Sequence, residues 1–138
     1  MFFKKSNINN KNEDFIKVCA LLIHAAKIDQ NYTLKEEEII KQTLLSFKVN
    51  LNDLDEIIFE AKKIEENSNQ ILSFTKEVKN MSEQDKITIV ESLWKIIYSN
   101  NQADIYETNL MRRLGGLLYI DSKTMGDIKE RIKNNFKK

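Results

Sequence analysis

The chain contains no proline, three glycines and one cysteine. Because short strands and tight turns depend on proline and glycine, their scarcity argues against a sandwich or barrel of many strands. One cysteine cannot form a disulfide within the chain, so a disulfide framework is excluded. No apolar run approaches the roughly 18 residues that a membrane span needs. Together these absences favour a domain made of long helices.

The chain also has no large excess of positive or negative charge, since 22 Lys and Arg nearly balance 21 Asp and Glu. The bulk charge therefore gives no indication of nucleic acid or an acidic membrane as a partner. The first five residues place two lysines after two phenylalanines, and no long apolar segment follows, so they do not read as a signal peptide. We expect a cytoplasmic protein without an integral membrane segment.

Apolar residues recur at steps of three and four along most of the 138 residues. This spacing is typical of a buried helical face. It begins near Glu13, after a leader of residues 1–12 that we expect to be flexible. It predicts seven helices, at about residues 13–28, 33–47, 50–64, 68–78, 82–97, 104–118 and from 121 onward. The sequence therefore predicts an all-α bundle that forms a single domain over residues 13–138.

Start signals precede several of these helices. Thr33 with Glu36 three places later fits the capping box, in which the Thr hydroxyl and the Glu carboxylate each accept a hydrogen bond from the other residue's backbone N–H. Asp104 with Glu107 repeats this pattern before the sixth helix. Asn50, Ser82 and Asp121 are predicted to cap the third, fifth and seventh helices.

The two capping boxes belong to a longer internal repeat. Shifting the sequence by 71 residues pairs Thr33 with Asp104 and Glu36 with Glu107, and the apolar positions on either side also match. The repeat covers about residues 15–64 and 86–135. It predicts two related halves of three helices each, joined by a short linking helix. Neither half alone could bury enough apolar surface to fold.

Two features of the second half need a structural explanation. Trp94 lies on the most hydrophobic helical face in the chain, so we predict that it is buried in a helix at the centre of the core. Gly115 and Gly116 interrupt the sixth helix, where each costs about 1 kcal/mol relative to Ala. Close approach of a neighbouring helix would offset that cost, and a bend or an early helix end is the alternative.

The turns before the two capping boxes carry the candidate site. Asp29, Asn31 and Glu36 offer oxygen atoms at the first turn, and Asp104 and Glu107 offer them at the second. Ca²⁺ and Mg²⁺ prefer such ligands. An EF-hand is excluded, because its sixth position would be Leu34 rather than Gly. We interpret both glutamates as helix caps, and a weak divalent-cation site is the alternative.

No catalytic group stands out beside these turns. Cys19 lies among apolar residues and is predicted to be a small buried residue. His24 is the only histidine, so a zinc site of the usual composition cannot be assembled. The chain has no phosphate-binding glycine loop and no nucleotide fingerprint. We therefore expect a protein that is not an enzyme and has no cofactor beyond that weak cation.

At its turns the sequence resembles the tellurite-resistance protein B family of TerB-like domains. The family pattern is an Ala-Asp-Gly turn, then an acidic residue and a glutamate, once in each half. Here it reads Ile28-Asp29-Gln30 before Glu36, and Ser99-Asn100-Asn101 before Asp104 and Glu107. A related helical domain occurs in a membrane-anchored DnaJ-like co-chaperone. Both turn glycines are replaced, and the second turn has Asn100 where the family favours Asp.

The resemblance implies a fold more than a mechanism. It implies a helical interaction or scaffold domain, related to stress response, that acts on a protein partner. The alternative is a sensor of divalent cations that uses the acidic turns. The sequence names no partner and no oligomeric state.

Overall fold

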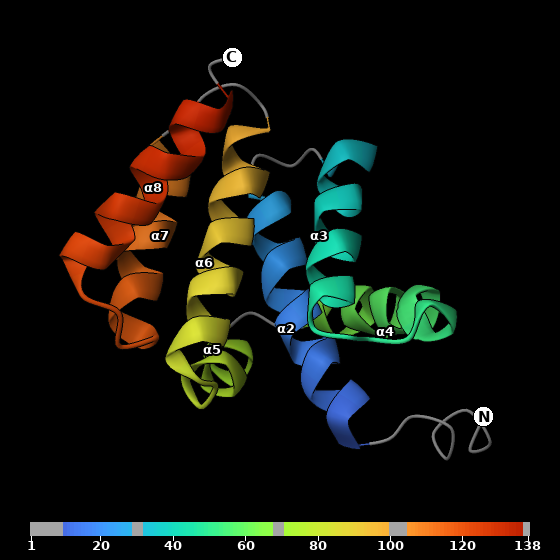
Figure 1. Cartoon of the computed structure of the whole chain (residues 1–138). Helices are drawn as coiled ribbons and strands as arrows, with labels where there is room; N and C mark the ends of the chain where they lie inside the picture. The colour runs from blue at the N-terminus through green and yellow to red at the C-terminus, as the bar shows by residue number, and fades with distance from the viewer. Residues whose placement is uncertain (1–9, 29–31, 68–70, 100–104, 137–138) are drawn as a thin grey trace.

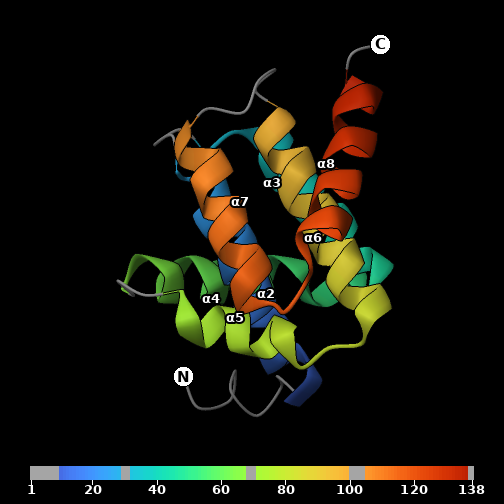
Figure 2. The same ribbon diagram turned by 90° about the vertical axis from the view of Figure 1, so that its left-hand side faces the viewer.

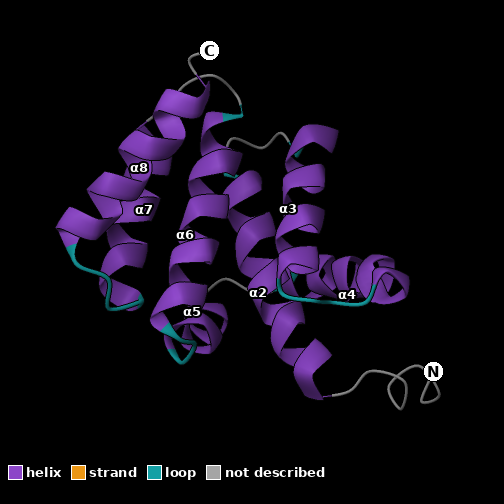
Figure 3. Ribbon diagram, in the orientation of Figure 1, coloured by secondary structure: helices purple, strands orange, loops and turns teal. Residues whose placement is uncertain are grey.

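The computed structural model describes residues 10–28, 32–67, 71–99 and 105–136. Within them the chain forms seven α-helices and one short 3-10 helix (Figure 3). They are α2 (Asn10–Ala26), α3 (Leu34–Ser46), η1 (Leu51–Asp53), α4 (Leu54–Glu66), α5 (Leu72–Lys79), α6 (Glu83–Tyr98), α7 (Ile105–Leu117) and α8 (Ser122–Phe136). No strand occurs in these four segments. The predicted all-α class is confirmed.

Helices α2 and α6 form the middle of the domain, and the others pack around them. Figure 1 shows α2, α3, α6, α7 and α8 with their axes roughly aligned, and α4 and α5 across their lower part. The view in Figure 2 confirms that α4 lies across the bundle. α2 contacts α3, α4, α5 and α6, whereas α6 contacts α2, α3, α5 and α8. The predicted central position of α6 is therefore shared with α2.

The core consists of the apolar faces of these helices. From α2 and α6 the fully buried side chains include Leu21, Leu22, Ile23, Ile89, Leu93 and Ile97. Further apolar residues of the helical faces are only partly buried and pack against this core, namely Ile39, Phe47, Ile64, Ile87 and Leu117. Trp94 is buried, as predicted. No helix of the described segments combines the length and apolar character needed to cross a bilayer.

Three helix starts differ from the predicted ones. α4 begins at Leu54, because residues 51–53 after the predicted cap Asn50 form the 3-10 helix η1. α2 begins at Asn10, inside the predicted leader, and residues 1–9 of that leader lie outside the described segments. α5 begins at Leu72, whereas a start at Ser68 or Asn69 was expected. Leu72 is half exposed because Phe74, Thr75 and Val78 define the buried face of α5 and Leu72 points away from it.

Helices α3 and α7 end in the same way. Lys48 and Tyr119 follow them with φ of 66° and 58°, which is the left-handed conformation that usually calls for glycine. In each case the next N–H reaches back to the last turn, from Val49 to Leu44 O at 3.2 Å and from Ile120 to Gly115 O at 2.9 Å. These are Schellman ends, and they lie 71 residues apart. Their match is what an internal repeat predicts, although the repeat of the two halves stays a prediction.

Candidate functional site

The first predicted capping box is present at the start of α3. The Glu36 N–H donates to Thr33 Oγ1 at 3.1 Å, and the Thr33 N–H donates to Glu36 Oε1 at 2.7 Å. Only 1% of Glu36 is exposed. The predicted capping role of Glu36 is confirmed, and its carboxylate lies inside the domain rather than on an open turn.

The rest of the predicted cation set lies mostly outside the described residues. Asp29, Asn31 and Asp104 fall in the segments that the structure does not describe, and Glu107 lies in α7 with its side chain undescribed. Among the described side chains, no three His, Cys, Asp or Glu residues gather in a way that could hold a metal. The cation site at the turns therefore stays a prediction.

A polar cluster that the sequence did not predict joins α3 to α4. Glu37 Oε1 accepts a hydrogen bond from the Tyr32 hydroxyl at 3.0 Å and lies 3.1 Å from the Lys62 ammonium. Burial acts to raise the pKa of Glu37, but hydrogen bonds from Lys62 and Tyr32 outweigh it and lower that pKa. The Lys62 ammonium also lies over the Tyr32 ring. This cluster fixes the start of α3 against α4.

The two residues with reactive potential are held in structural roles. Cys19 is fully buried in α2, and burial raises the pKa of its thiol, so a nucleophilic thiolate is disfavoured. His24 Nδ1 lies 3.2 Å from Glu65 Oε2 on α4, and the Lys27 ammonium lies 2.6 Å from the other oxygen of Glu65. This cluster links α2 to α4.

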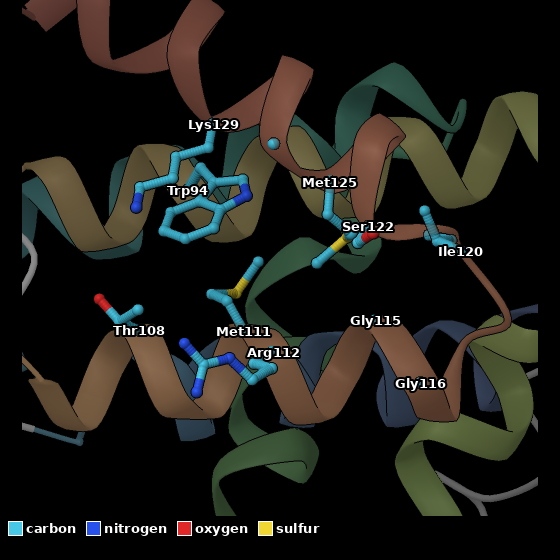
Figure 4. A pocket seen from close by; sticks show the side chains of 11 residues that line it. Trp94, Thr108, Met111, Arg112, Gly115, Gly116, Ile120, Ser122, Met125 and Lys129 are labelled. Atoms are coloured by element: carbon cyan, nitrogen blue, oxygen red, sulfur yellow. The ribbon is translucent and has the colours of Figure 1, made fainter.

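The cavity with the clearest chemical character lies between α7 and α8. It measures about 400 Å³, which falls within the usual range for small-molecule sites. In Figure 4, Met111 and Arg112 project from α7, Met125 and Lys129 project from α8, and the indole of Trp94 on α6 lies between them. The complete described lining is Trp94, Thr108, Met111, Arg112, Gly115, Gly116, Ile120, Ser122, Met125, Gly126 and Lys129. We call this cavity the α7–α8 pocket.

Trp94, one of the lining residues, has an unused hydrogen-bond donor beside this pocket. The residue is 3% exposed, and its Nε1 is buried without a partner. In the described part of the chain only Glu56 Oε1 shares that condition. Buried N–H groups are nearly always paired, because leaving one unpaired costs about 1–3 kcal/mol. Figure 4 places the indole nitrogen at the end of the ring nearer to Met125, whose flexible side chain could move aside for an acceptor.

The pocket has a cationic end and an apolar end. Toward one end lie Thr108, Arg112 and Lys129, whereas Ile120 lies at the other (Figure 4). The Lys129 ammonium is 5.4 Å from the centre of the Trp94 ring, within cation–π range. None of the described lining residues is acidic. The pocket is thus suited to an acceptor group and a negative charge.

All three glycines of the chain line this pocket. At Gly115 an added Cβ would lie 3.3 Å from Met125 Cγ, so the predicted close approach of a neighbouring helix is confirmed there. At Gly116 and Gly126 an added Cβ would meet nothing within 4 Å, and neither residue has positive φ. Neither packing nor backbone conformation therefore requires glycine at these two positions.

Sequence reasoning missed the pocket because its lining comes from three helices and depends on how they pack. Trp94 and Met111 read as ordinary core residues at helical spacing. The one available signal was the placement of every glycine in the second half, with Gly126 inside the last helix.

Comparisons with known proteins identify the fold family. The family model described as tellurite resistance protein TerB matches residues 15–130, which span α2 to most of α8 and include the whole α7–α8 pocket. Comparisons with curated proteins and with solved structures gave no match. The further relation to a DnaJ-like co-chaperone stays a prediction. Because the match covers most of the sequence, the chain belongs to the TerB family.

Proposed function

We propose that this protein is a non-enzymatic interaction domain and that it binds its ligand in the α7–α8 pocket. The observation that carries the proposal is the buried Trp94 Nε1, which lacks a partner beside a cavity of about 400 Å³. A bound acceptor would satisfy this donor and remove the cost of leaving it unpaired.

The chemistry of the lining supports binding rather than catalysis. General acid–base catalysis most often uses an imidazole or a carboxylate, and nucleophilic catalysis often uses a thiol or an activated hydroxyl. The described lining has no histidine, no cysteine and no acidic residue. Thr108 and Ser122 provide hydroxyls, but no described lining residue could act as their general base.

The proposal has two further parts. The TerB family is described by tellurite resistance, and on that description we propose a stress-related role. A protein partner is also proposed, on the prediction from the sequence alone. The cation-sensing alternative has no support from the described residues and is tested separately below.

The single tryptophan makes the proposal easy to test, because the protein has one indole N–H signal in a proton–nitrogen correlation spectrum. A library of small fragments would be screened by this spectrum. We expect fragments that bind to shift the Trp94 indole signal, and Gly126→Leu, which adds a side chain inside the pocket, to abolish the shifts.

The matched control is Gln42→Leu on α3, an exposed position that does not line the α7–α8 pocket. It should leave the fragment shifts unchanged. Fragments that bind without moving the indole signal, or that bind Gly126→Leu as well as the wild type, would show that the pocket is not the binding site.

A further inference from the structure

The α7–α8 pocket also carries information on what it binds. The geometry points to a small organic carboxylate with an apolar body as its ligand: the carboxylate lies over the Trp94 indole, with one oxygen toward Nε1 and the other toward the flexible side chains of Arg112 and Lys129, and the body lies against Met111, Met125 and Ile120. This inference rests on the proposed function, because it names the ligand class of the same pocket.

The need for an acceptor follows from Trp94. An indole N–H can only donate, so its missing partner must be an acceptor. Hydroxyls and amide carbonyls would meet that condition, and so would an anionic oxygen. Trp94 alone therefore leaves the charge of the ligand open.

The charge is decided by the two cations. Arg112 comes from α7 and Lys129 from α8, on opposite walls, and no acidic residue lies among the described lining to neutralise them. Among the described ion pairs neither residue takes part, whereas Arg131, two residues beyond Lys129, pairs with Glu91. Hydrogen bonds from charged groups to a carboxylate are roughly twice as strong as neutral ones. An anion is therefore preferred over a neutral acceptor.

The apolar part of the ligand follows from the other side chains. Met111 and Met125 face the cavity from opposite helices, and Ile120 closes the end away from the cations (Figure 4). Methionine side chains adapt to ligands of different shape. An inorganic anion would leave these contacts unused, so we infer a hydrocarbon body rather than a free phosphate or sulfate.

The glycines explain how such a body is accommodated. Gly116 and Gly126 line the cavity, and the space that a Cβ would occupy at each is empty. Each glycine lowers helix stability by about as much as one good hydrogen bond contributes. A site that keeps this space for a ligand accounts for both residues.

Three ligands with the same eight-carbon chain separate charge from apolar contact: octanoate, octan-1-ol and octylammonium. Binding to the full chain would be measured from the Trp94 indole shift at concentrations below micelle formation. We expect octanoate to bind about tenfold more tightly than octanol, the ratio that one charge-assisted hydrogen bond supplies. Octylammonium should bind most weakly, because its charge repels Arg112 and Lys129.

Variants assign the effect to named side chains. Arg112→Gln combined with Lys129→Gln should weaken octanoate binding about tenfold and leave octanol unchanged. The matched control is Arg113→Gln with Lys133→Gln, which changes the net charge equally on the same two helices but outside the lining. This control should bind octanoate like the wild type. Trp94→Phe, followed by calorimetry, should weaken both ligands, because either oxygen loses its donor.

The outcomes distinguish this inference from the proposed function. Equal binding of octanoate and octanol, both lost in Gly126→Leu, would overturn the carboxylate inference while leaving the pocket as a binding site. Equal weakening by the two double variants would also overturn it, because the attraction would then be non-specific. Failure of all three ligands would overturn it as well, and the fragment screen would then decide the proposed function.

Discussion

Glu36 is almost completely removed from solvent, yet its carboxylate accepts a hydrogen bond from the backbone N–H of Thr33, the N-cap of α3. The first N–H groups of a helix have no partner within the helix, and the positive end of the helix dipole favours a negative charge there. Glu36 meets both needs at once. A cation at the same carboxylate would compete with the Thr33 N–H for its oxygens.

We expect Thr33→Ala to lower the free energy of unfolding by about 1 kcal/mol, the usual loss for an N-cap. Glu36→Gln should change it less, because Gln also serves at the third position of a capping box. Both would be measured by urea denaturation.

The cation-sensing alternative predicts that the melting temperature depends on divalent cations and that these variants remove the dependence. A ligand that binds only the folded state raises the melting temperature by mass action. With capping alone, millimolar Ca²⁺ or Mg²⁺ should leave the wild-type melting temperature unchanged. A rise that disappears in both Asp29→Asn and Glu36→Gln would favour the cation site instead.

Glu37 gives the stability of the protein a pH dependence. Its pKa is lowered in the folded state below the ordinary value of 4.5, chiefly because Lys62 and Tyr32 outweigh the effect of burial. A group with a lowered folded-state pKa stabilises the fold at pH values above its unfolded pKa. That contribution is lost as the pH falls through the folded-state pKa.

We therefore expect the wild type to be more stable than Glu37→Gln at neutral pH, and this difference to shrink as the pH falls below about 4.5. The measurement is the free energy of unfolding of both proteins between about pH 7 and pH 3. Lys62→Gln should lose the same pH-dependent part, whereas Lys41→Gln, 4.0 Å from Glu37, should lose little of it. A difference between wild type and Glu37→Gln that stays constant down to the lowest pH would contradict this assignment.

At the scale of the helices, the glycines of α7 and α8 have two different explanations, one in helix packing and one in the proposed ligand site. Gly115 is in contact with Met125, and the Schellman end of α7 begins from its carbonyl. Gly126 lies in the second turn of α8 with open space beside it. Glycine is therefore present for two different reasons within one pocket.

We expect Gly126→Ala to raise the free energy of unfolding by up to about 1 kcal/mol, the difference in helix propensity between the two residues. Gly115→Ala should gain less or lose stability, because its new methyl group would press on Met125. Thermal and urea denaturation would compare the two variants. If Gly115→Ala were the more stabilising of the pair, the close contact with Met125 would not be limiting.

The helices also show which parts of the structure the sequence could predict. Thr33 and Ser82 were predicted as caps from residues within three positions of them, and each accepts the expected bond at the start of its helix. Asn50 also accepts a backbone bond, but it caps the 3-10 helix η1 rather than α4. Such bonds depend only on local chain geometry. The pocket could not be predicted in this way, because the unpaired state of Trp94 depends on where α7 and α8 lie relative to α6. The helix ends at Lys48 and Tyr119 were also missed, since neither residue is the glycine that usually marks a left-handed end.

In the whole molecule, the two predicted halves are interleaved rather than separate. α2 belongs to the first half and α6 to the second, and they pack against each other in the middle of the core. α3 also packs on α6, where Thr43 Oγ1 and Ser92 Oγ form a buried hydrogen bond of 2.6 Å. Removing either half would expose the apolar faces of α2 or α6 to water.

This arrangement predicts that the domain unfolds as a single cooperative unit. Trp94 fluorescence reports only on the second half, because it is the one tryptophan, whereas far-UV circular dichroism reports on all the helices. In a urea titration the two signals should give the same midpoint and the same slope.

A fragment of residues 1–67 should be largely unfolded, since α2 would lose α5 and α6, and helices without tertiary packing are marginal in water. The full chain with Gln42→Leu, at an exposed position of α3, serves as a control in which both signals should keep the same midpoint. A fragment with native helicity and a cooperative transition, or a fluorescence midpoint separated from the dichroism midpoint, would instead mean that each half carries its own stability.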